Sequence, residues 1–125
     1  MADRKVEVLQ VVLEAFNQHD LDKIMSFFSE EIVFDSPRGP DCWGRRFVGL
    51  EEVRRGIAAR FEGIPDVHYG DDDHFVGGRR GLSEWTISGT TVDGVAIEVR
   101  GCDIWTFDDD DQITRKDSFW KLRES

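Results

Sequence analysis

The alternation of hydrophobic and polar residues is clearest over residues 95–107. Successive side chains of a strand point to opposite faces, so the odd-numbered residues of this stretch share one surface. That surface is apolar or aromatic at every position except Asp103. A carboxylate on a core-facing surface is costly unless it is paired, protonated or facing a pocket. The members of this face are Val95, Ile97, Val99, Gly101, Asp103, Trp105 and Phe107.

Apolar residues at a spacing of three to four predict three helices. Asp20 has the position and chemistry of an N-cap for the second helix, and Gly63 and Pro65 mark the end of the third. The apolar faces are Val6, Leu9, Leu13 and Phe16 in the first helix, Leu21, Ile24, Phe27 and Phe28 in the second, and Leu50, Val53, Ile57 and Phe61 in the third.

The strand pattern predicts a brief strand over residues 31–36 that Pro37 stops, followed by a loop over residues 37–48. Four further strands, over residues 66–76, 82–90, 95–107 and 113–122, follow the third helix and are separated by Gly- and Asp-rich turns. The expected class is therefore α+β, with three N-terminal helices packed in a strongly curved antiparallel sheet that encloses a cone. Residues 1–125 are expected to form one domain.

Side-chain parity predicts which residues of each strand face the core and which face outward. Ser83, Trp85 and Ile87 are predicted to point inward. In the last strand both faces carry aromatic residues, so its register stays open. A strand that is apolar on both sides indicates that a second subunit covers the outer face, which predicts a homodimer.

Composition narrows the class of partner. A hydrophobic share of 39%, with nine Phe and four Trp, indicates a packed core. The net charge of −10 argues against binding of nucleic acid or of an anionic membrane. No apolar signal region or membrane span is recognisable, so a cytoplasmic protein is expected. Cys42 and Cys102 match no metal-binding or redox spacing and are expected to be reduced thiols.

Three segments together carry a resemblance to a known superfamily. They are HDLDKIMSFFSEEIVFDSP (residues 19–37), FVGLEEVRRGI (47–57) and GCDIWTFDDDDQITRKDSFWK (101–121). In order and spacing they resemble the nuclear transport factor 2-like superfamily, which includes the SnoaL-like polyketide cyclases and the ketosteroid isomerases. The resemblance implies a curved sheet wrapped around helices, a deep apolar pocket and frequent homodimers.

Only one functional position of the ketosteroid isomerases transfers to this chain. Residues 103–107, Asp-Ile-Trp-Thr-Phe, match the segment whose Asp donates a hydrogen bond to the substrate oxygen. The isomerase base falls at Ser36, and the isomerase Tyr falls near Val12. The Arg-x-Asp pair of related epoxide hydrolases is absent from residues 84–87. Neither named chemistry therefore transfers residue by residue.

Several polar residues are candidates for catalysis, and a structural interpretation stands beside the catalytic one. In an apolar site the pKa of Asp103 should rise, so that Asp103 acts as acid, base or hydrogen-bond donor. The alternative is a carboxylate held by an Arg or a Trp N–H as part of the scaffold. Ser36 is either a substrate contact or an ordinary strand-end residue. His68 or His74 is a possible acid–base partner at the pocket rim, whereas a metal site would need a third ligand that the spacing does not supply.

The first hypothesis is an enzyme that acts on a small hydrophobic carbonyl compound by proton transfer, as an isomerase, cyclase or dehydratase. It needs no metal and no cofactor. The alternatives are a non-catalytic, dimeric ligand-binding module and a protein-interaction module of the same fold. The predicted catalytic residues are Asp103, Ser36 and His68, and the predicted ligand contacts, which plain core packing would equally explain, are Trp43, Trp85, Trp105, Trp120, Phe34, Ile87 and Val99.

Overall fold

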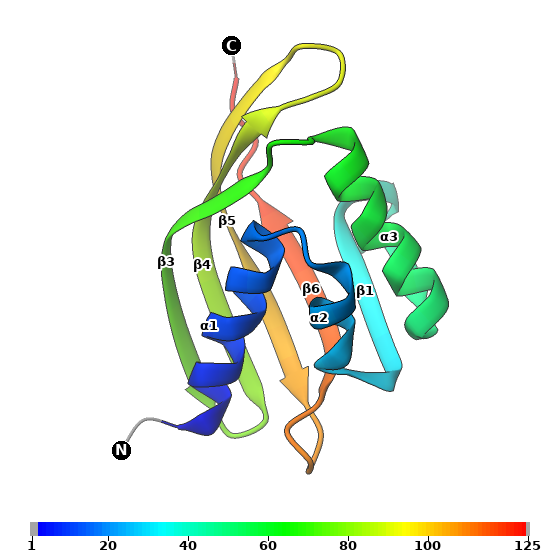
Figure 1. Ribbon diagram of the computed structural model, residues 1–125, viewed down its shortest axis with the longest axis vertical. Coiled ribbons are helices and arrows are strands. Elements are labelled where there is room, and N and C mark those ends of the chain that lie inside the picture. The colour runs from blue at the N-terminus through cyan, green and yellow to red at the C-terminus, as the bar shows by residue number, and fades with distance from the viewer. Residues whose placement is uncertain (1–2, 125) are drawn as a thin grey trace.

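Three helices cover one face of a curled, six-stranded sheet in the computed structural model, which describes residues 3–124 (Figure 1). This arrangement confirms the α+β class with three helices. Within the described part of the chain, no helix has the length and apolar character to cross a membrane. The elements are α1 (Arg4–Asn17), α2 (Leu21–Ser26), β1 (Phe28–Asp41), β2 (Gly44–Val48), α3 (Gly49–Gly63), β3 (His68–Gly77), β4 (Arg80–Thr90), β5 (Ala96–Phe107) and β6 (Ile113–Trp120).

The sheet order is β2-β1-β6-β5-β4-β3. All neighbouring strands are antiparallel except β1 and β6, which are parallel. The prediction of a wholly antiparallel sheet is wrong for this pair. After the β1–β2 hairpin the chain crosses through α3 to the far edge and returns strand by strand, so its last strand lies beside its first. The third helix is accordingly inserted between strands and does not precede them all.

Strand β1 is longer than its sequence pattern predicts. The chain continues past Pro37 to Asp41 and turns directly into β2, where a loop over residues 37–48 was expected. Proline interrupts a strand because it cannot donate a ladder hydrogen bond. Here the β1–β2 register shifts between Ser36 and Asp41, and β6 pairs with β1 only as far as Asp35. Pro37 therefore lies where no regular ladder bond is required of its nitrogen.

Capping and apolar spacing explain the helices. Asp20 is the N-cap of α2, and its carboxylate accepts a hydrogen bond from the backbone N–H of Lys23 at 3.1 Å. Leu9 and Phe16 of α1 and Ile57 of α3 are buried against the sheet, as their spacing predicts. The helices and the inner sheet face therefore share one hydrophobic core.

A bulge in β3 changes which residues face the core. Simple alternation predicts that His68 and His74 share a face. The β3–β4 register shifts between Gly70 and Asp73, and Asp71 adopts φ 50°. An extra residue in a strand exchanges the two faces beyond it. As a result His68 is exposed, whereas the His74 side chain is only 3% exposed.

The inward face of β4 and β5 contains a tightly fitted glycine. Ser83, Trp85 and Ile87 are buried, as predicted, and Trp85 lies directly opposite Gly101 on β5. A Cβ atom on Gly101 would lie 2.5 Å from the Trp85 ring and 2.5 Å from the carbonyl oxygen of Phe119. The missing side chain thus gives the Trp85 indole the space to lie over β5.

Replacement of Gly101 by Ala is expected to destabilise the fold by about 1–3 kcal/mol, because neither the buried indole nor a backbone carbonyl can move aside cheaply. Gly77→Ala is the matched control in an exposed strand position, since a Cβ atom there meets nothing within 4 Å. The control should change stability by no more than about 0.5 kcal/mol. Urea unfolding monitored by tryptophan fluorescence measures both; equal midpoints would contradict the packing described.

Candidate functional site

The Asp103 carboxylate is buried on the inner sheet face, and both of its oxygens have donors. Lys116 Nζ donates to Oδ1 at 2.7 Å, and the Ser118 hydroxyl donates to the same oxygen. The Trp85 indole N–H donates to Oδ2 at 3.1 Å. Asp103 is 2% exposed and Lys116 4%, so the two form a fully buried ion pair. Of the alternatives raised by the sequence, the paired carboxylate is the one that the structure contains.

Strand register explains why these groups meet. Asp103 lies opposite Ser83 on β4 and opposite Ser118 on β6. Lys116 precedes Ser118 by two residues and therefore points to the same face. The open register of β6 is thereby settled: Lys116 and Ser118 point inward with Trp120, and Asp117 and Phe119 point outward.

The Lys116 ammonium lies among aromatic rings. Its Nζ is 4.7 Å from the ring centre of Phe34, 5.2 Å from that of Phe16 and 5.5 Å from that of Trp105. Burial lowers the pKa of Lys116, and the negative charge of Asp103 opposes that effect only in part. Each nearby ring face offers the cation a weak electrostatic attraction. The amine is thus held in a site where its proton is easier to remove than that of a surface lysine.

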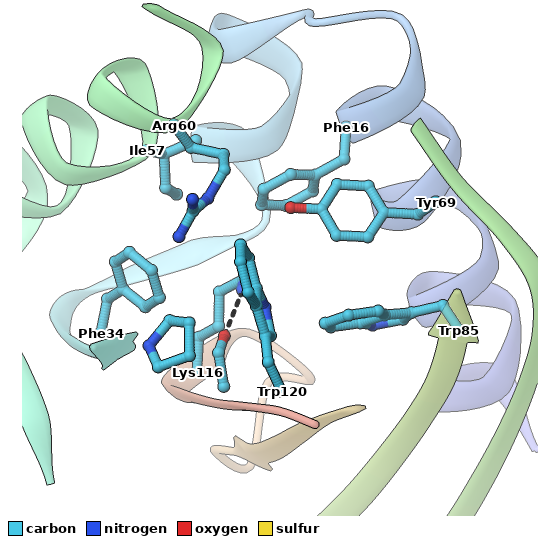
Figure 2. Close-up of a pocket in the computed structure, with 10 residues that line it drawn as sticks. Phe16, Phe34, Ile57, Arg60, Tyr69, Trp85, Lys116 and Trp120 are labelled. Carbon is cyan, nitrogen blue, oxygen red and sulfur yellow. Dashed lines mark hydrogen bonds between the residues drawn. The ribbon is translucent and has the colours of Figure 1, made fainter. Parts of the chain in front are cut away.

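A small cavity lies on the helix side of Lys116 (Figure 2). Its volume is about 10 Å³, enough for about one water molecule. Asp103 does not line it, because Lys116 and Ser118 stand between the carboxylate and the cavity. The lining residues are Phe16, Phe34, Pro37, Ile57, Arg60, Tyr69, Trp85, Lys116, Ser118 and Trp120.

Two further polar side chains reach the cavity from other elements. Arg60 descends from α3, and its guanidinium carbon lies 4.4 Å from the ring centre of Trp120. Burial lowers the pKa of Arg60. Tyr69 of β3 packs edge-on against Trp85 with ring centres 5.0 Å apart, and burial raises the pKa of its phenol. The cavity is therefore lined by aromatic rings together with a few polar groups.

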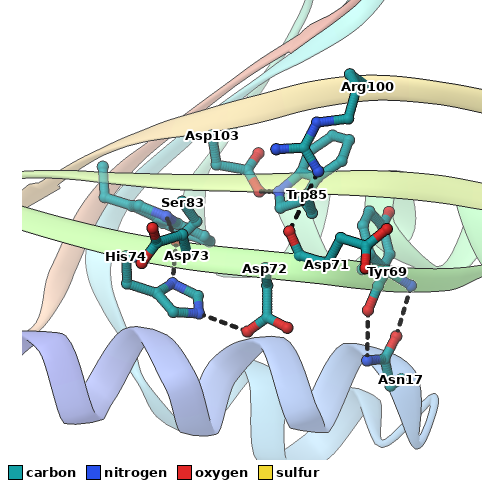
Figure 3. A network of polar contacts seen from close by, with 11 residues as sticks. Asn17, Tyr69, Asp71, Asp72, Asp73, His74, Ser83, Trp85, Arg100 and Asp103 are labelled. Carbon is teal, nitrogen blue, oxygen red and sulfur yellow. Dashed lines mark hydrogen bonds and ion pairs between the residues drawn. The ribbon is translucent and has the colours of Figure 1, made fainter.

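A second buried network lies beside the first, next to α1 (Figure 3). The Trp105 indole N–H donates to Ser83 Oγ at 3.0 Å, and His74 Nδ1 lies 2.8 Å from the same oxygen. His74 Nε2 lies 2.9 Å from an Asp72 carboxylate oxygen. With Ser83 only 1% exposed, this Asp–His–Ser row supports the core and offers no accessible nucleophile.

The structure brings some of the predicted site residues together and separates others. Ser36 donates to the backbone oxygen of Arg38 at 2.9 Å and lines an outer groove that also contains the half-exposed Trp43. His68 is exposed and does not line the cavity, because its neighbour Tyr69 points inward and alternation places His68 on the outer face. Within residues 3–124, no group of three or more His, Cys, Asp or Glu side chains is placed to hold a metal ion. Of the predicted ligand contacts, Phe34, Trp85 and Trp120 line the cavity, whereas Trp43, Trp105, Ile87 and Val99 do not.

Sequence reasoning missed the residues that the helices contribute, and Lys116 and Ser118 of β6. Phe16 and Ile57 look like ordinary core positions, and Arg60 looks like a solvated helix residue. Lys116 carries the one signal that was available: it shares parity with Ser118 and Trp120, which would place a lysine in the core. A lysine in the core is reasonable only where an acid on the neighbouring strand can pair with its charge.

The curled sheet with helices on its inner face is the arrangement of an NTF2-like fold. The family model of the SnoaL-like domain matches residues 9–116, and the chain belongs to that family. No curated protein matches the sequence significantly.

Solved structures show the same fold at low sequence identity. A candidate polyketide cyclase from Xanthomonas campestris pv. campestris has 22% identity and a TM-score of 0.83, covering 95% of this chain and 91% of that one. The epoxide hydrolase/cyclase-like enzyme SalBIII, with a role in pyran ring formation in the polyether salinomycin, has 17% identity and a TM-score of 0.80, covering 95% and 92%. A candidate isomerase from Bacillus subtilis has 16% identity and a TM-score of 0.78, covering 94% and 87%.

The buried pair is expected to show strong coupling in a double-mutant cycle. Asp103→Leu or Lys116→Met alone leaves one uncompensated buried charge and should destabilise the protein by about 3–5 kcal/mol. Replacing both residues removes that penalty, so the double variant should be more stable than either single variant. Urea unfolding measures all four proteins. Additive losses would mean that the two side chains do not form the pair described.

The chain contains a single tyrosine, Tyr69, so the titration of its phenol reports directly on the cavity wall. Because burial disfavours the phenolate, Tyr69 should ionise above the usual pKa of about 10. The folded state then holds the phenol proton more tightly than the unfolded state, so stability falls as the pH rises above about 10. The absorbance at 295 nm, which reports the phenolate, should rise only at a pH above this value, or together with the unfolding that circular dichroism detects. A midpoint near 10 in a still-folded protein would contradict the burial.

Proposed function

We propose that this protein catalyses proton transfer on a small, largely apolar carbonyl compound, as an isomerase, cyclase or dehydratase would. The observation that carries the proposal is the buried Lys116–Asp103 pair, whose ammonium forms part of the wall of an aromatic cavity. A charged acid–base pair in apolar surroundings acts strongly on a bound dipole, because little water screens it.

The proposal divides the chemistry between Lys116 and Asp103. The Lys116 ammonium donates a hydrogen bond to the substrate carbonyl oxygen and stabilises the negative charge that develops there. Ser118 lies between Asp103 and the cavity, accepting from Lys116 Nζ at 2.7 Å while its own hydroxyl donates to Asp103. As the substrate C–H bond breaks, Ser118 Oγ takes that proton and passes its own to the carboxylate. The products of the step are an enolate beside Lys116 and a neutral Asp103.

Substrate entry requires the cavity to enlarge, since it holds about one water molecule. Trp120 is the side chain placed to allow this. Together with Pro37 and Ser118 it lines both the cavity and the outer groove beside Trp43, so its indole forms part of the wall between the two spaces. In the proposal, rotation of Trp120 joins the groove to the cavity and admits a flat ligand.

The relatives support the class of reaction and leave the substrate open. The three similar structures described above carry cyclase or isomerase names, at 16–22% identity. At such identity the likeness shows the fold, so the substrate class rests on the cavity walls of this chain. Five aromatic side chains line the cavity beside its polar groups, which favours a flat, apolar compound. They are Phe16, Phe34, Tyr69, Trp85 and Trp120.

One observation favours a non-catalytic, ligand-binding role as the second candidate. Protein donors already occupy both oxygens of Asp103. A carboxylate held in this way orients Lys116 towards a bound polar group without exchanging protons. The same pocket would then serve binding alone.

The proposal includes a cytoplasmic homodimer with one domain per chain. Phe119 is 49% exposed on the outer sheet face, where it lines a groove with Gly101 and Cys102. An exposed aromatic side chain on an open sheet face is a common site of subunit contact.

Exchange of carbon-bound hydrogen tests the reaction without knowledge of the natural substrate. The probe is 2-tetralone, a flat ketone with acidic hydrogens next to its carbonyl, in deuterated buffer. The protein should accelerate deuterium uptake, as followed by NMR. Asp103→Asn should reduce the enzymatic rate by about 10²-fold or more, because it removes the proton acceptor. Glu98→Gln, an exposed acid on the same strand, is the matched control and should retain full activity.

Circular dichroism establishes that each variant is folded, and calorimetry establishes whether it binds the ketone. Full activity in folded Asp103→Asn would overturn the role of this residue. Binding of 2-tetralone and related flat ketones without exchange would favour the ligand-binding candidate.

A further inference from the structure

Arg60 is a half-buried cation without an acidic partner. Within residues 3–124, the ion pairs join other residues, and no carboxylate lies within 4.0 Å of the Arg60 guanidinium. Lys116 differs, since Asp103 neutralises it directly. The cavity therefore contains one compensated positive charge and one that is not compensated. A guanidinium removed from water without a counter-charge is unfavourable unless something else supplies one.

The position of Arg60 directs that charge into the cavity. Arg60 lies in the last turn of α3, one turn after Ile57, and both side chains line the cavity. Its guanidinium stacks on the Trp120 indole and points towards the space between Phe34 and Trp120 (Figure 2). Burial lowers the pKa of Arg60, the negative charges of Tyr69 and Asp103 oppose that effect in part, and the positive charge of Arg38 adds to it. Arg60 thus brings to the cavity a cation with no carboxylate in direct contact, in a protein whose net charge is −10.

We propose that Arg60 binds the carboxylate of the substrate, which makes the substrate a flat, largely apolar keto acid. This inference rests on the proposed function, because it assigns a ligand class to the same cavity. The planar guanidinium can donate two parallel hydrogen bonds to a carboxylate, a geometry that a lysine ammonium does not offer. The stacked Trp120 indole restricts the orientation of the guanidinium and so favours such a contact.

The proposal also orients the substrate. The acid group lies at Arg60 on the helix side, and the carbonyl oxygen lies at Lys116 on the sheet side. The apolar body of the substrate then packs between Phe34, Trp85 and Trp120. A neutral compound of the same shape leaves Arg60 without a counter-charge in direct contact and should bind more weakly, because burial disfavours an unpaired cation.

Isothermal titration calorimetry with 2-naphthoate and with 2-naphthamide tests this inference, since the two probes share a shape and differ in charge. The wild-type protein in low-salt buffer is expected to bind 2-naphthoate at least tenfold more tightly than 2-naphthamide. Arg60→Met should abolish that preference while retaining affinity for the amide, which shows that the cavity is intact. Arg55→Met is the matched control on the same helix, exposed and paired with Glu51, and should keep the preference. Arg60→Gln provides a second neutral variant if the methionine variant does not fold.

The outcomes separate this inference from the proposed function. Equal affinity for both probes in the wild-type protein, or an undiminished preference in either folded Arg60 variant, would overturn the role of Arg60 and leave the catalytic proposal standing. Failure of both naphthyl probes and of 2-tetralone to bind would overturn the cavity as a ligand site, and with it both proposals.

Discussion

The Lys116–Asp103 ion pair is the interaction on which the rest of this structure depends. Removal of two charges from water is unfavourable by several kcal/mol for each ion, and only close geometry with extra hydrogen bonds compensates for it. Ser118 and Trp85 supply those bonds from the two neighbouring strands. A shift of one residue in the register of β6 would turn Lys116 outward and leave Asp103 buried and unpaired. The pair therefore fixes the alignment of β5 with β6, and the Trp85 hydrogen bond to Asp103 extends that alignment to β4.

Two tryptophans connect this pair to the hydrophobic core in a reciprocal manner. Trp85 of β4 donates its indole N–H to Asp103 of β5, and Trp105 of β5 donates its N–H back to Ser83 of β4. Each large ring fills core volume, and its single polar atom satisfies a buried acceptor. Gly101 makes the first of these contacts possible, because the Trp85 ring occupies the volume that a side chain would take. A polar cluster can thus exist in the core without unpaired groups.

The sequence predicted the features that depend on local periodicity. Alternation along β5 identified Asp103 as a core-facing acid, and helical spacing together with Asp20 placed the helices. It could not predict features that depend on contacts between distant segments. The bulge at Asp71 reverses the faces of β3 although the residues around it look regular, and the parallel pairing of β1 with β6 depends on the whole chain path. Arg60 reaches the cavity only because α3 crosses β1, so its role has no signature in the helix itself.

A comparison with the second buried acid explains why a lysine occupies the central pair. Asp35 lies on the outward side of β1 and forms ion pairs with Arg46 at 2.8 Å and Arg115 at 2.6 Å. An arginine stays protonated in such a pair, so Asp35 can act only as a permanent tie between β1 and its two neighbours. A lysine amine loses its proton far more readily when buried, and burial lowers the pKa of Lys116. Of the two acids buried within residues 3–124, only Asp103 is therefore paired with a group whose charge can change, and that group is the one that faces the cavity.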